Sequence, residues 1–177
     1  MNKKVLITGG AGYIGSILTP LLLDRGFSVT VLDNLLFGQA SLLDCCINPN
    51  FTFIHGDISD RCIMRKLLVS HDVVIPLAAI VGAPACSQNP ALAKLINEEA
   101  PLWMLKQLSV DQNVVFPTTN SGYGVGGAES FCDEDSPLRP ISDYAKAKVK
   151  VEEAYLQKGN SVSFRLATVF GMSPRMR

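Results

Sequence analysis

The stretch Lys4-Val-Leu-Ile-Thr-Gly-Gly-Ala-Gly-Tyr-Ile-Gly15 decides the fold of this chain. Apolar strand formers are followed by glycines at positions 9, 10, 12 and 15, after which a sequence compatible with a helix begins. This order predicts a strand, a tight turn at Gly9, and the N-terminus of a helix that Gly15 allows to pack closely. Gly12 lacks a Cβ, so a pyrophosphate could approach the backbone at the positive end of the helix dipole. An ordinary glycine turn is the alternative, because short glycine patterns also arise by chance.

The composition indicates a globular chain. Of its 177 residues, 47% are hydrophobic and 18% are charged, and its 16 basic side chains balance its 16 acidic ones. Such a chain has no basic field for nucleic acid or an anionic membrane, and no apolar run reaches membrane-spanning length. The first strand is too short for a signal-peptide core, so we expect a soluble, cytoplasmic protein. The five cysteines form no C-x-x-C pair and only two histidines are present, so we expect reduced thiols and no metal site.

Apolar strands alternate with helical patterns along the chain. The expected strands are 5–7, 27–32, 51–54, 72–76, 113–117 and 161–166. The expected helices are 13–24, a helix capped by Ser59 that runs to about residue 70, 91–109 with an interruption at Pro101, and 142–158. The alternation predicts an α/β fold, with one domain over 1–177 built as a doubly wound parallel sheet, the Rossmann fold. Ligands of such sheets bind beyond the carboxyl ends of the strands.

Asp33 stands just past the second expected strand, 18 residues after Gly15. A carboxylate at this place can accept both ribose hydroxyls of an adenosine, and it would repel a 2′-phosphate. It therefore favours NAD over NADP. The alternative is a solvent-exposed aspartate in a turn.

Tyr144-Ala-Lys-Ala-Lys148 opens the last expected helix. Because positions i and i+4 share a helix face, the ammonium of Lys148 can lie beside the Tyr144 hydroxyl. The positive charge would stabilise a phenolate and make the tyrosine a usable general base near neutral pH. Lys146 faces elsewhere. A tyrosine and a lysine four residues apart are common by chance. The position of this pair one loop beyond the fifth expected strand favours the catalytic interpretation.

Together these motifs resemble the extended short-chain dehydrogenase/reductases, the NAD-dependent epimerase/dehydratase family of the UDP-glucose 4-epimerase type. The phrase Pro117-Thr-Thr-Asn-Ser-Gly-Tyr-Gly124 is similar to the family's S-S-S-x-x-V-Y-G, which puts its catalytic hydroxyl on Thr119. The resemblance implies a catalytic set of Thr119, Tyr144 and Lys148, with Ser121 and Thr168 near the substrate. The implied NAD contacts are Gly9, Gly12, Tyr13, Ile14, Gly15, Asp33, Asn34, Asp57, Ile58, Leu77, Ala78, Ala79, Asn97, Tyr144 and Lys148.

The chain departs from the family pattern at several positions. Asn120 and Ser121 stand where the family's dehydratases carry Asp-Glu, and neither can act as acid or base, so a dehydratase or a decarboxylase is disfavoured. Pro76 replaces a common aromatic residue or histidine. Asn97 is nearly as well explained as an ordinary surface asparagine.

The resemblance implies an NAD-dependent sugar-nucleotide epimerase or related oxidoreductase that acts on a nucleotide sugar. It also implies a homodimer formed through helices 91–109 and 142–158. Members of the family usually continue well beyond this length, so we expect the chain to be the N-terminal, cofactor-binding part, with the C-terminal substrate domain missing. The alternative is a non-catalytic NAD-binding module.

Overall fold

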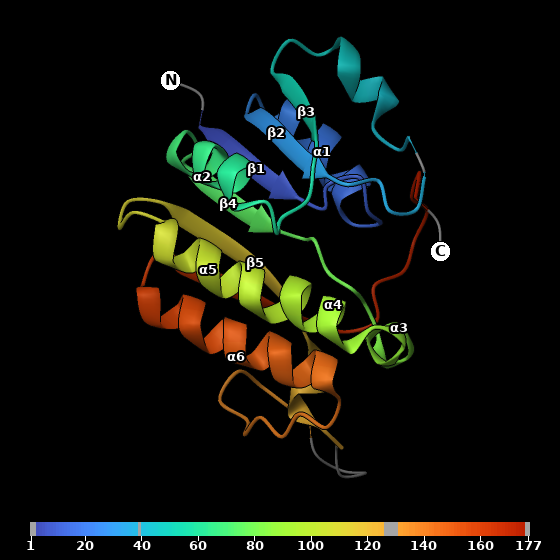
Figure 1. Cartoon of the computed structure of the whole chain (residues 1–177), viewed down its shortest axis with the longest axis vertical. Coiled ribbons are helices and arrows are strands. Elements are labelled where there is room, and N and C mark those ends of the chain that lie inside the picture. Colours follow the sequence, from blue (N-terminus) through green and yellow to red (C-terminus); the bar gives the residue numbers. More distant parts are fainter. Residues whose placement is uncertain (1–2, 39, 126–130, 176–177) are drawn as a thin grey trace.

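The fold is seen in a computed structural model, which describes residues 3–38, 40–125 and 131–175 (Figure 1). Six parallel strands form one sheet in the order β3-β2-β1-β4-β5-β6. Their bounds are β1 (Lys4–Thr8), β2 (Ser28–Asp33), β3 (Phe51–His55), β4 (Val73–Pro76), β5 (Asn113–Thr119) and β6 (Ser161–Leu166). The strand order reverses direction between β1 and β4, as in a doubly wound sheet. The predicted α/β fold is confirmed.

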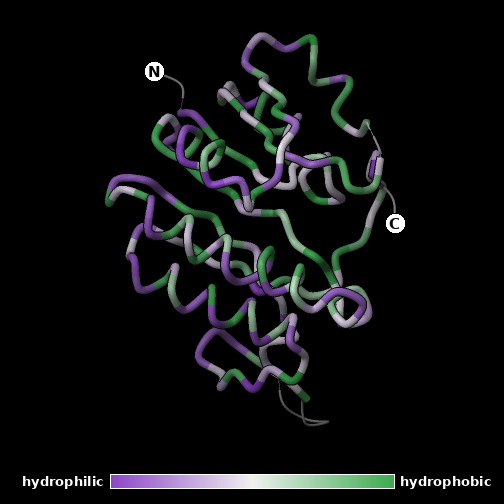
Figure 2. Tube along the Cα trace, in the orientation of Figure 1, coloured by the Kyte–Doolittle hydropathy of each residue, from purple (hydrophilic) through white to green (hydrophobic). Residues whose placement is uncertain are grey.

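Helices cover both faces of the sheet. The helical elements are α1 (Gly15–Asp24), η1 (Leu43–Ile47), α2 (Arg61–Val69), α3 (Ala83–Gln88), α4 (Pro90–Lys94), η2 (Leu95–Glu99), α5 (Ala100–Gln107), η3 (Asn120–Tyr123) and α6 (Asp143–Lys158). Here η1 and η3 are 3₁₀ turns and η2 is a π turn. Hydrophilic and hydrophobic positions alternate along α6, which is found in Figure 2 at the place that Figure 1 labels.

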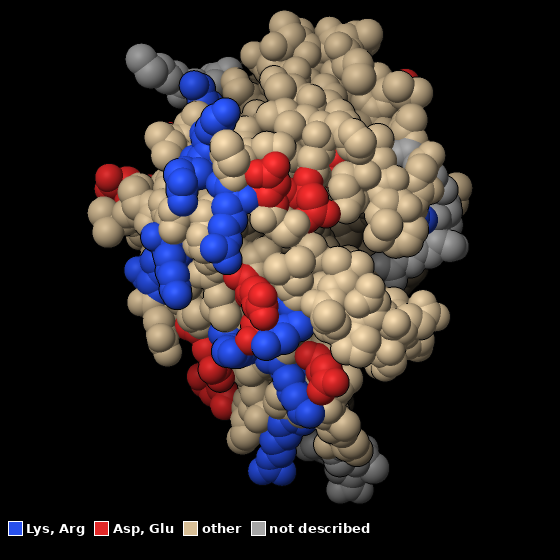
Figure 3. All heavy atoms as spheres, viewed as in Figure 1, with Lys and Arg blue, Asp and Glu red and all other residues tan. Residues whose placement is uncertain are grey.

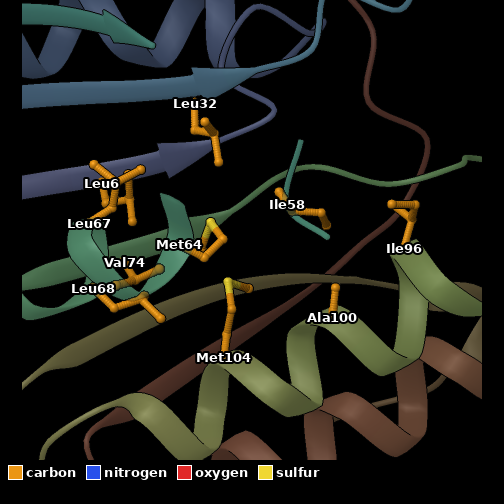
Figure 4. Packing of buried hydrophobic residues seen from close by; sticks show 10 residues of the cluster. All are labelled: Leu6, Leu32, Ile58, Met64, Leu67, Leu68, Val74, Ile96, Ala100 and Met104. Carbon is orange, nitrogen blue, oxygen red and sulfur yellow. The ribbon is translucent and has the colours of Figure 1, made fainter. Parts of the chain in front are cut away.

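Strand β1 supplies side chains to both layers because successive residues of a strand point to opposite faces. Val5 and Ile7 pack with α1 and η1, whereas Leu6 packs with α2 and α5. Figure 4 shows the second layer, in which the two methionines Met64 and Met104 meet between α2 and α5. A third cluster joins α6 to β5, with the rings of Phe116 and Tyr155 stacked 5.2 Å apart. The result is a rigid sheet whose strand ends can carry a site.

The helix expected over 91–109 differs from the observed one. A separate helix, α3, precedes it, and the helical run then extends over α4, η2 and α5 and ends at Gln107. The π turn η2 ends at Glu99, two residues before Pro101. Proline lacks an N–H and its ring crowds the carbonyl four residues earlier, so a widened turn at this place relieves both problems.

Two smaller expectations also need correction. The N-cap of α2 is Asp60, whose carboxylate accepts from the backbone of Cys62 and Ile63, and not Ser59. The Ser59 hydroxyl instead donates to Asp57 at 2.7 Å. Strand β5 extends to Thr119, two residues beyond its expected end at residue 117, and η3 and a loop then lead to α6. Residues 126–130 of that loop lie outside the described residues.

Candidate functional site

A cavity of about 860 Å³ opens at the carboxyl ends of the strands. Residues from both halves of the sheet line it, which agrees with the expected place for a ligand in a doubly wound fold. The structure brings together most of the residues that the sequence singled out. The lining includes Gly9, Gly12, Tyr13, Ile14, Gly15, Asp33, Asn34, Asp57, Ile58, Leu77, Ala78, Ala79, Thr119, Ser121, Tyr144, Lys148 and Thr168.

Asn97 lies behind the cavity wall and does not line it. Its side-chain oxygen accepts from the backbone N–H of Ile80 at 2.9 Å, and its amide nitrogen donates to the Ile80 carbonyl at 2.9 Å. The side chain is buried, at 3% exposure, so it is not a surface asparagine. It acts on the cavity through the loop after β4, which it fixes from behind.

The glycine turn has the tight geometry that its sequence predicts. Gly9 has a φ of +71°, and a Cβ there would lie 2.5 Å from the backbone nitrogen of Ala78. Only glycine accepts both the left-handed backbone and this close approach. At Gly15 a Cβ would lie 2.5 Å from the Cα of Gly10, so this glycine lets the helix pack against the turn itself, not against the strand. A Cβ added at Gly12 would have one neighbour within 4 Å, the Gly9 carbonyl oxygen at 3.1 Å.

Two carboxylates stand at the ends of β2 and β3. Asp33 accepts from the backbone N–H of Ala11 at 2.9 Å and from that of Leu35 at 2.8 Å. It therefore ties the end of β2 to the glycine turn. Asp57 accepts from Asn34 and from Ser59. Burial raises the pKa of Asp57, but these hydrogen bonds outweigh burial and hold the pKa below its usual value.

Lys148 is the buried cation of the site, with 6% exposure. Its Nζ donates to the Pro117 carbonyl at 3.1 Å and lies 4.6 Å from the centre of the Phe116 ring. Burial lowers the pKa of this lysine to about 8, because water no longer solvates the ammonium. Tyr144 lies one helical turn earlier, in the first turn of α6, where the Ser142 hydroxyl accepts from the Ala145 backbone. The Thr119 hydroxyl accepts from the Ser121 N–H at 3.2 Å.

The segment after β6 returns to the N-terminus of α1. The Tyr13 hydroxyl donates to the Gly171 carbonyl at 2.5 Å, and the Ser173 hydroxyl donates to the Tyr13 carbonyl at 3.0 Å. Ser173 also shares a hydrogen bond with Ser16 at 2.9 Å. The Arg175 guanidinium lies 4.3 Å over the Phe37 ring, and both side chains line the cavity. The sequence does not predict these hydrogen bonds, because contacts between residues so far apart in the chain leave no local pattern.

Two further observations concern the described part of the chain only. It contains no group of three or more His, Cys, Asp or Glu side chains that could hold a metal ion. Among its helices, none has the length and apolar character needed to cross a membrane.

Comparisons with known proteins agree with this geometry. The model of the NAD dependent epimerase/dehydratase family matches residues 5–177. The chain is 32% identical to UDP-glucose 4-epimerase of Lactobacillus helveticus over 96% of this chain and 52% of that protein. It is 34% identical to UDP-N-acetyl-alpha-D-glucosaminuronate decarboxylase of Bacillus cytotoxicus over 78% of this chain and 43% of that protein.

A similar solved structure is that of the Bordetella bronchiseptica enzyme WbmH in complex with NAD⁺. It superposes with a TM-score of 0.81 at 32% identity, over 94% of this chain and 57% of that one. The chain thus spans about half the length of the curated relatives it matches. Because the family model covers nearly all of the sequence, the chain belongs to the NAD dependent epimerase/dehydratase family.

Proposed function

We propose that the cavity binds NAD and that the chain carries the cofactor half of a sugar-nucleotide epimerase or a closely related oxidoreductase. The observation that carries this proposal is that one cavity is lined both by the glycine turn with Asp33 and by Thr119, Tyr144 and Lys148. The first group suits a dinucleotide and the second suits proton transfer. The L. helveticus relative, a UDP-glucose 4-epimerase, supports a UDP-sugar as substrate.

The residues present fit the cofactor. Gly12 leaves its backbone open to a pyrophosphate beside the N-terminus of α1, where the helix dipole favours an anion. The Asp33 carboxylate can accept from ribose hydroxyls with the lone pairs that Ala11 and Leu35 leave free. Asp57 and Ile58 would lie at the adenine, and the backbone of Leu77 to Ala79 beside the ribose and pyrophosphate.

The chemistry follows from the groups at the other end of the cavity. Bound NAD would supply the acceptor of a hydride from the sugar and its donor on return. Tyr144 would remove the proton from the sugar hydroxyl, and the Thr119 hydroxyl would hydrogen-bond the same oxygen. The Lys148 ammonium would favour the phenolate of Tyr144 and bind the nicotinamide ribose. Ser121 and Thr168 would contact the substrate, and Asn97 would steady the loop at Ile80 beside the cofactor.

Calorimetry with NAD and NADP tests the binding half of the proposal. We expect NAD to bind more tightly than NADP, because Asp33 repels a 2′-phosphate. Asp33→Ala should weaken NAD binding by about 2 kcal/mol, the order of a charged hydrogen bond, and should narrow the preference over NADP. Unchanged selectivity would count against the ribose contact. Absence of NAD binding would remove the proposal.

Turnover tests the catalytic half. UDP-, GDP- and dTDP-sugars are incubated with the chain and NAD, and the sugar product is separated from its epimer. Tyr144→Phe should abolish turnover while NAD still binds; a fully active variant would refute the role of Tyr144. NAD binding without turnover of any sugar would favour the second candidate, a non-catalytic NAD-binding module. The observation behind that candidate is that the chain spans about half of its relatives.

We also propose a homodimer through two long helices, the helical run of α4, η2 and α5 together with α6. The outward face of this helix pair carries charges of both signs, as Figure 3 shows, with ion pairs such as Lys150 to Glu98. A dimer built on this face should weaken with salt, because screening reduces exposed charge pairing. Light scattering after size-exclusion chromatography in low and high salt measures it. A monomer in both buffers would refute the dimer.

A further inference from the structure

A partly buried cluster beside the cavity, made of Glu152, Arg165 and Tyr123, plays no part in the proposed chemistry. Arg165 on β6 donates from Nε to Oε1 of Glu152 on α6 at 2.9 Å. The side chains are 17% and 3% exposed, so the pair is largely removed from water. Neither residue lines the cavity.

The same guanidinium reaches a third element. Nη1 of Arg165 donates to the Tyr123 hydroxyl at 3.1 Å and to the Glu134 carbonyl at 2.9 Å. The guanidinium carbon lies 5.3 Å over the Tyr123 ring. The Tyr123 hydroxyl in turn donates to the Asp133 carbonyl at 2.8 Å. One planar group therefore joins α6, the turn η3 and the loop at 133–134.

The turn η3 carries the cavity wall. It begins directly after Thr119, and both Thr119 and Ser121 line the cavity. A Cβ at Gly122 would lie 3.0 Å from a methyl group of Val149, so η3 rests on α6. Glu152 lies one helical turn beyond Lys148, whose Nζ is bonded to the Pro117 carbonyl on β5. Helix α6 is thus fixed to β5 through Lys148 and to β6 through Glu152.

The energetics argue against a stabilising role for this pair. Burying two charges costs solvation that their attraction often fails to return, and apolar replacements of such pairs are frequently neutral. Oε2 of Glu152 is buried and finds no hydrogen-bond partner among the described residues. What the pair does supply is a directional link, because the planar guanidinium holds its donors in a fixed geometry while it bonds Oε1 of Glu152, the Tyr123 hydroxyl and the Glu134 carbonyl.

We propose that Arg165 is a positioning residue, which with Glu152 and Tyr123 fixes η3 against α6 and so sets where Thr119 and Ser121 lie relative to Tyr144. The role of those cavity residues rests on the proposed function; the positional effect of the cluster does not. Displacement of a reacting group by about 1 Å can lower a rate roughly a hundredfold.

The test compares an apolar replacement of the pair with a control. The double variant Glu152→Leu/Arg165→Met removes both charges together, which avoids leaving one buried and unpaired. The control is Lys150→Met, a change on the same helix α6 that breaks the exposed pair between Lys150 and Glu98 of η2. For each protein, the thermal midpoint, the NAD affinity and the ¹H–¹⁵N NMR spectrum are measured.

We expect the double variant to fold with a thermal midpoint close to that of the wild type and to bind NAD within about threefold. Its amide signals over 119–123 should shift, whereas those of the control should not. Where the wild type turns over a sugar nucleotide, kcat should fall at least about tenfold with KM little changed. Unshifted amide signals over 119–123 in a folded double variant would overturn the proposal, whether or not the chain is catalytic.

A second variant keeps the test decisive if the double variant fails to fold. Tyr123→Phe retains the ring and the ion pair and removes only the hydroxyl that Arg165 and Asp133 share. It should shift the amide signals of η3 and leave those of β1 and α1 in place. Spectra of η3 identical to those of the wild type would overturn the role of the cluster.

Discussion

The buried ammonium of Lys148 makes the stability of the chain depend on pH in an unusual direction. Its folded-state pKa is about 8, against an ordinary value of 10.5. Between these two values the unfolded chain holds the proton and the native chain releases it. Stability rises with pH wherever the unfolded state binds more protons. Lys148 therefore lowers stability below pH 8 and ceases to do so as the pH rises through 8 toward 10.5.

The size of the effect follows from the two pKa values. Raising the pH from 7 to 9.5 should increase the contribution of Lys148 to the free energy of unfolding by about 2 kcal/mol, at 1.36 kcal/mol per pKa unit. Lys148→Met provides the comparison, because methionine fills similar space and carries no proton. Other groups, such as the Tyr155 hydroxyl, whose pKa burial raises, are common to both proteins, so their effects on the pH dependence cancel in the difference.

Urea unfolding of both proteins, followed by the fluorescence of Trp103, measures this difference. Trp103 is the one tryptophan of the sequence and packs on α5 against Arg61 and Arg65 of α2, so its emission reports the core between these helices. The wild-type stability minus that of the variant should become more favourable as the pH rises. A difference that stays flat within about 0.5 kcal/mol, the error of linear extrapolation, would refute a buried, poorly solvated ammonium.

Three further predictions use simpler readouts. Gly9→Ala should destabilise the chain by more than about 2 kcal/mol, and Gly38→Ala by only about 1 kcal/mol. Both glycines have a positive φ, but of the two only Gly9 has backbone atoms within 3 Å of a new Cβ, and equal losses of stability in urea unfolding would contradict this reasoning. Because burial lowers the pKa of His71, the wild type should lose stability as the pH falls below about 6.5, and the variant His71→Gln should lose less. Parallel acid unfolding curves of the two proteins would count against a buried neutral His71. A thiol reagent at pH 8 should modify the three exposed cysteines quickly, which are Cys46, Cys62 and Cys132. The buried thiols of Cys45 and Cys86 should react only after unfolding, and equal rates for all five would contradict this prediction.

Much of the fold is predictable because it rests on local patterns. The apolar runs gave strands whose bounds differ by one or two residues from the observed ones, and the glycine turn with Asp33 occupies the strand ends as the fold rules require. These signals work because a strand, a tight turn and a helix start each depend on neighbouring residues. The same holds for Tyr144 and Lys148, whose spacing on one helix puts them on one face.

The remainder depends on contacts between distant residues. No residue near Arg165 in the sequence indicates that it contacts Glu152 and Tyr123. Each of these two residues, taken alone, resembles an ordinary polar surface position. The π turn η2 is not predictable from the sequence for a similar reason. Pro101 indicates an interruption of the helix, but whether the helix kinks, ends or widens there depends on the side chains packed around it. The bond from Ser173 to Ser16 joins the two ends of the described chain and has no local signature.

The central position of β1 also bears on how the protein is made. This strand precedes both of its hydrogen-bonding neighbours, β2 on one side and β4 on the other, and β4 follows only after β2 and β3. Until Pro76 has been added, one edge of β1 therefore has no partner strand, and Leu6 still lacks the cover of α5, which follows later in the chain. Unpaired edges of this kind invite association with other chains. Before β4 is complete, that edge of β1 is open to association with other chains, and pairing with β4 closes it.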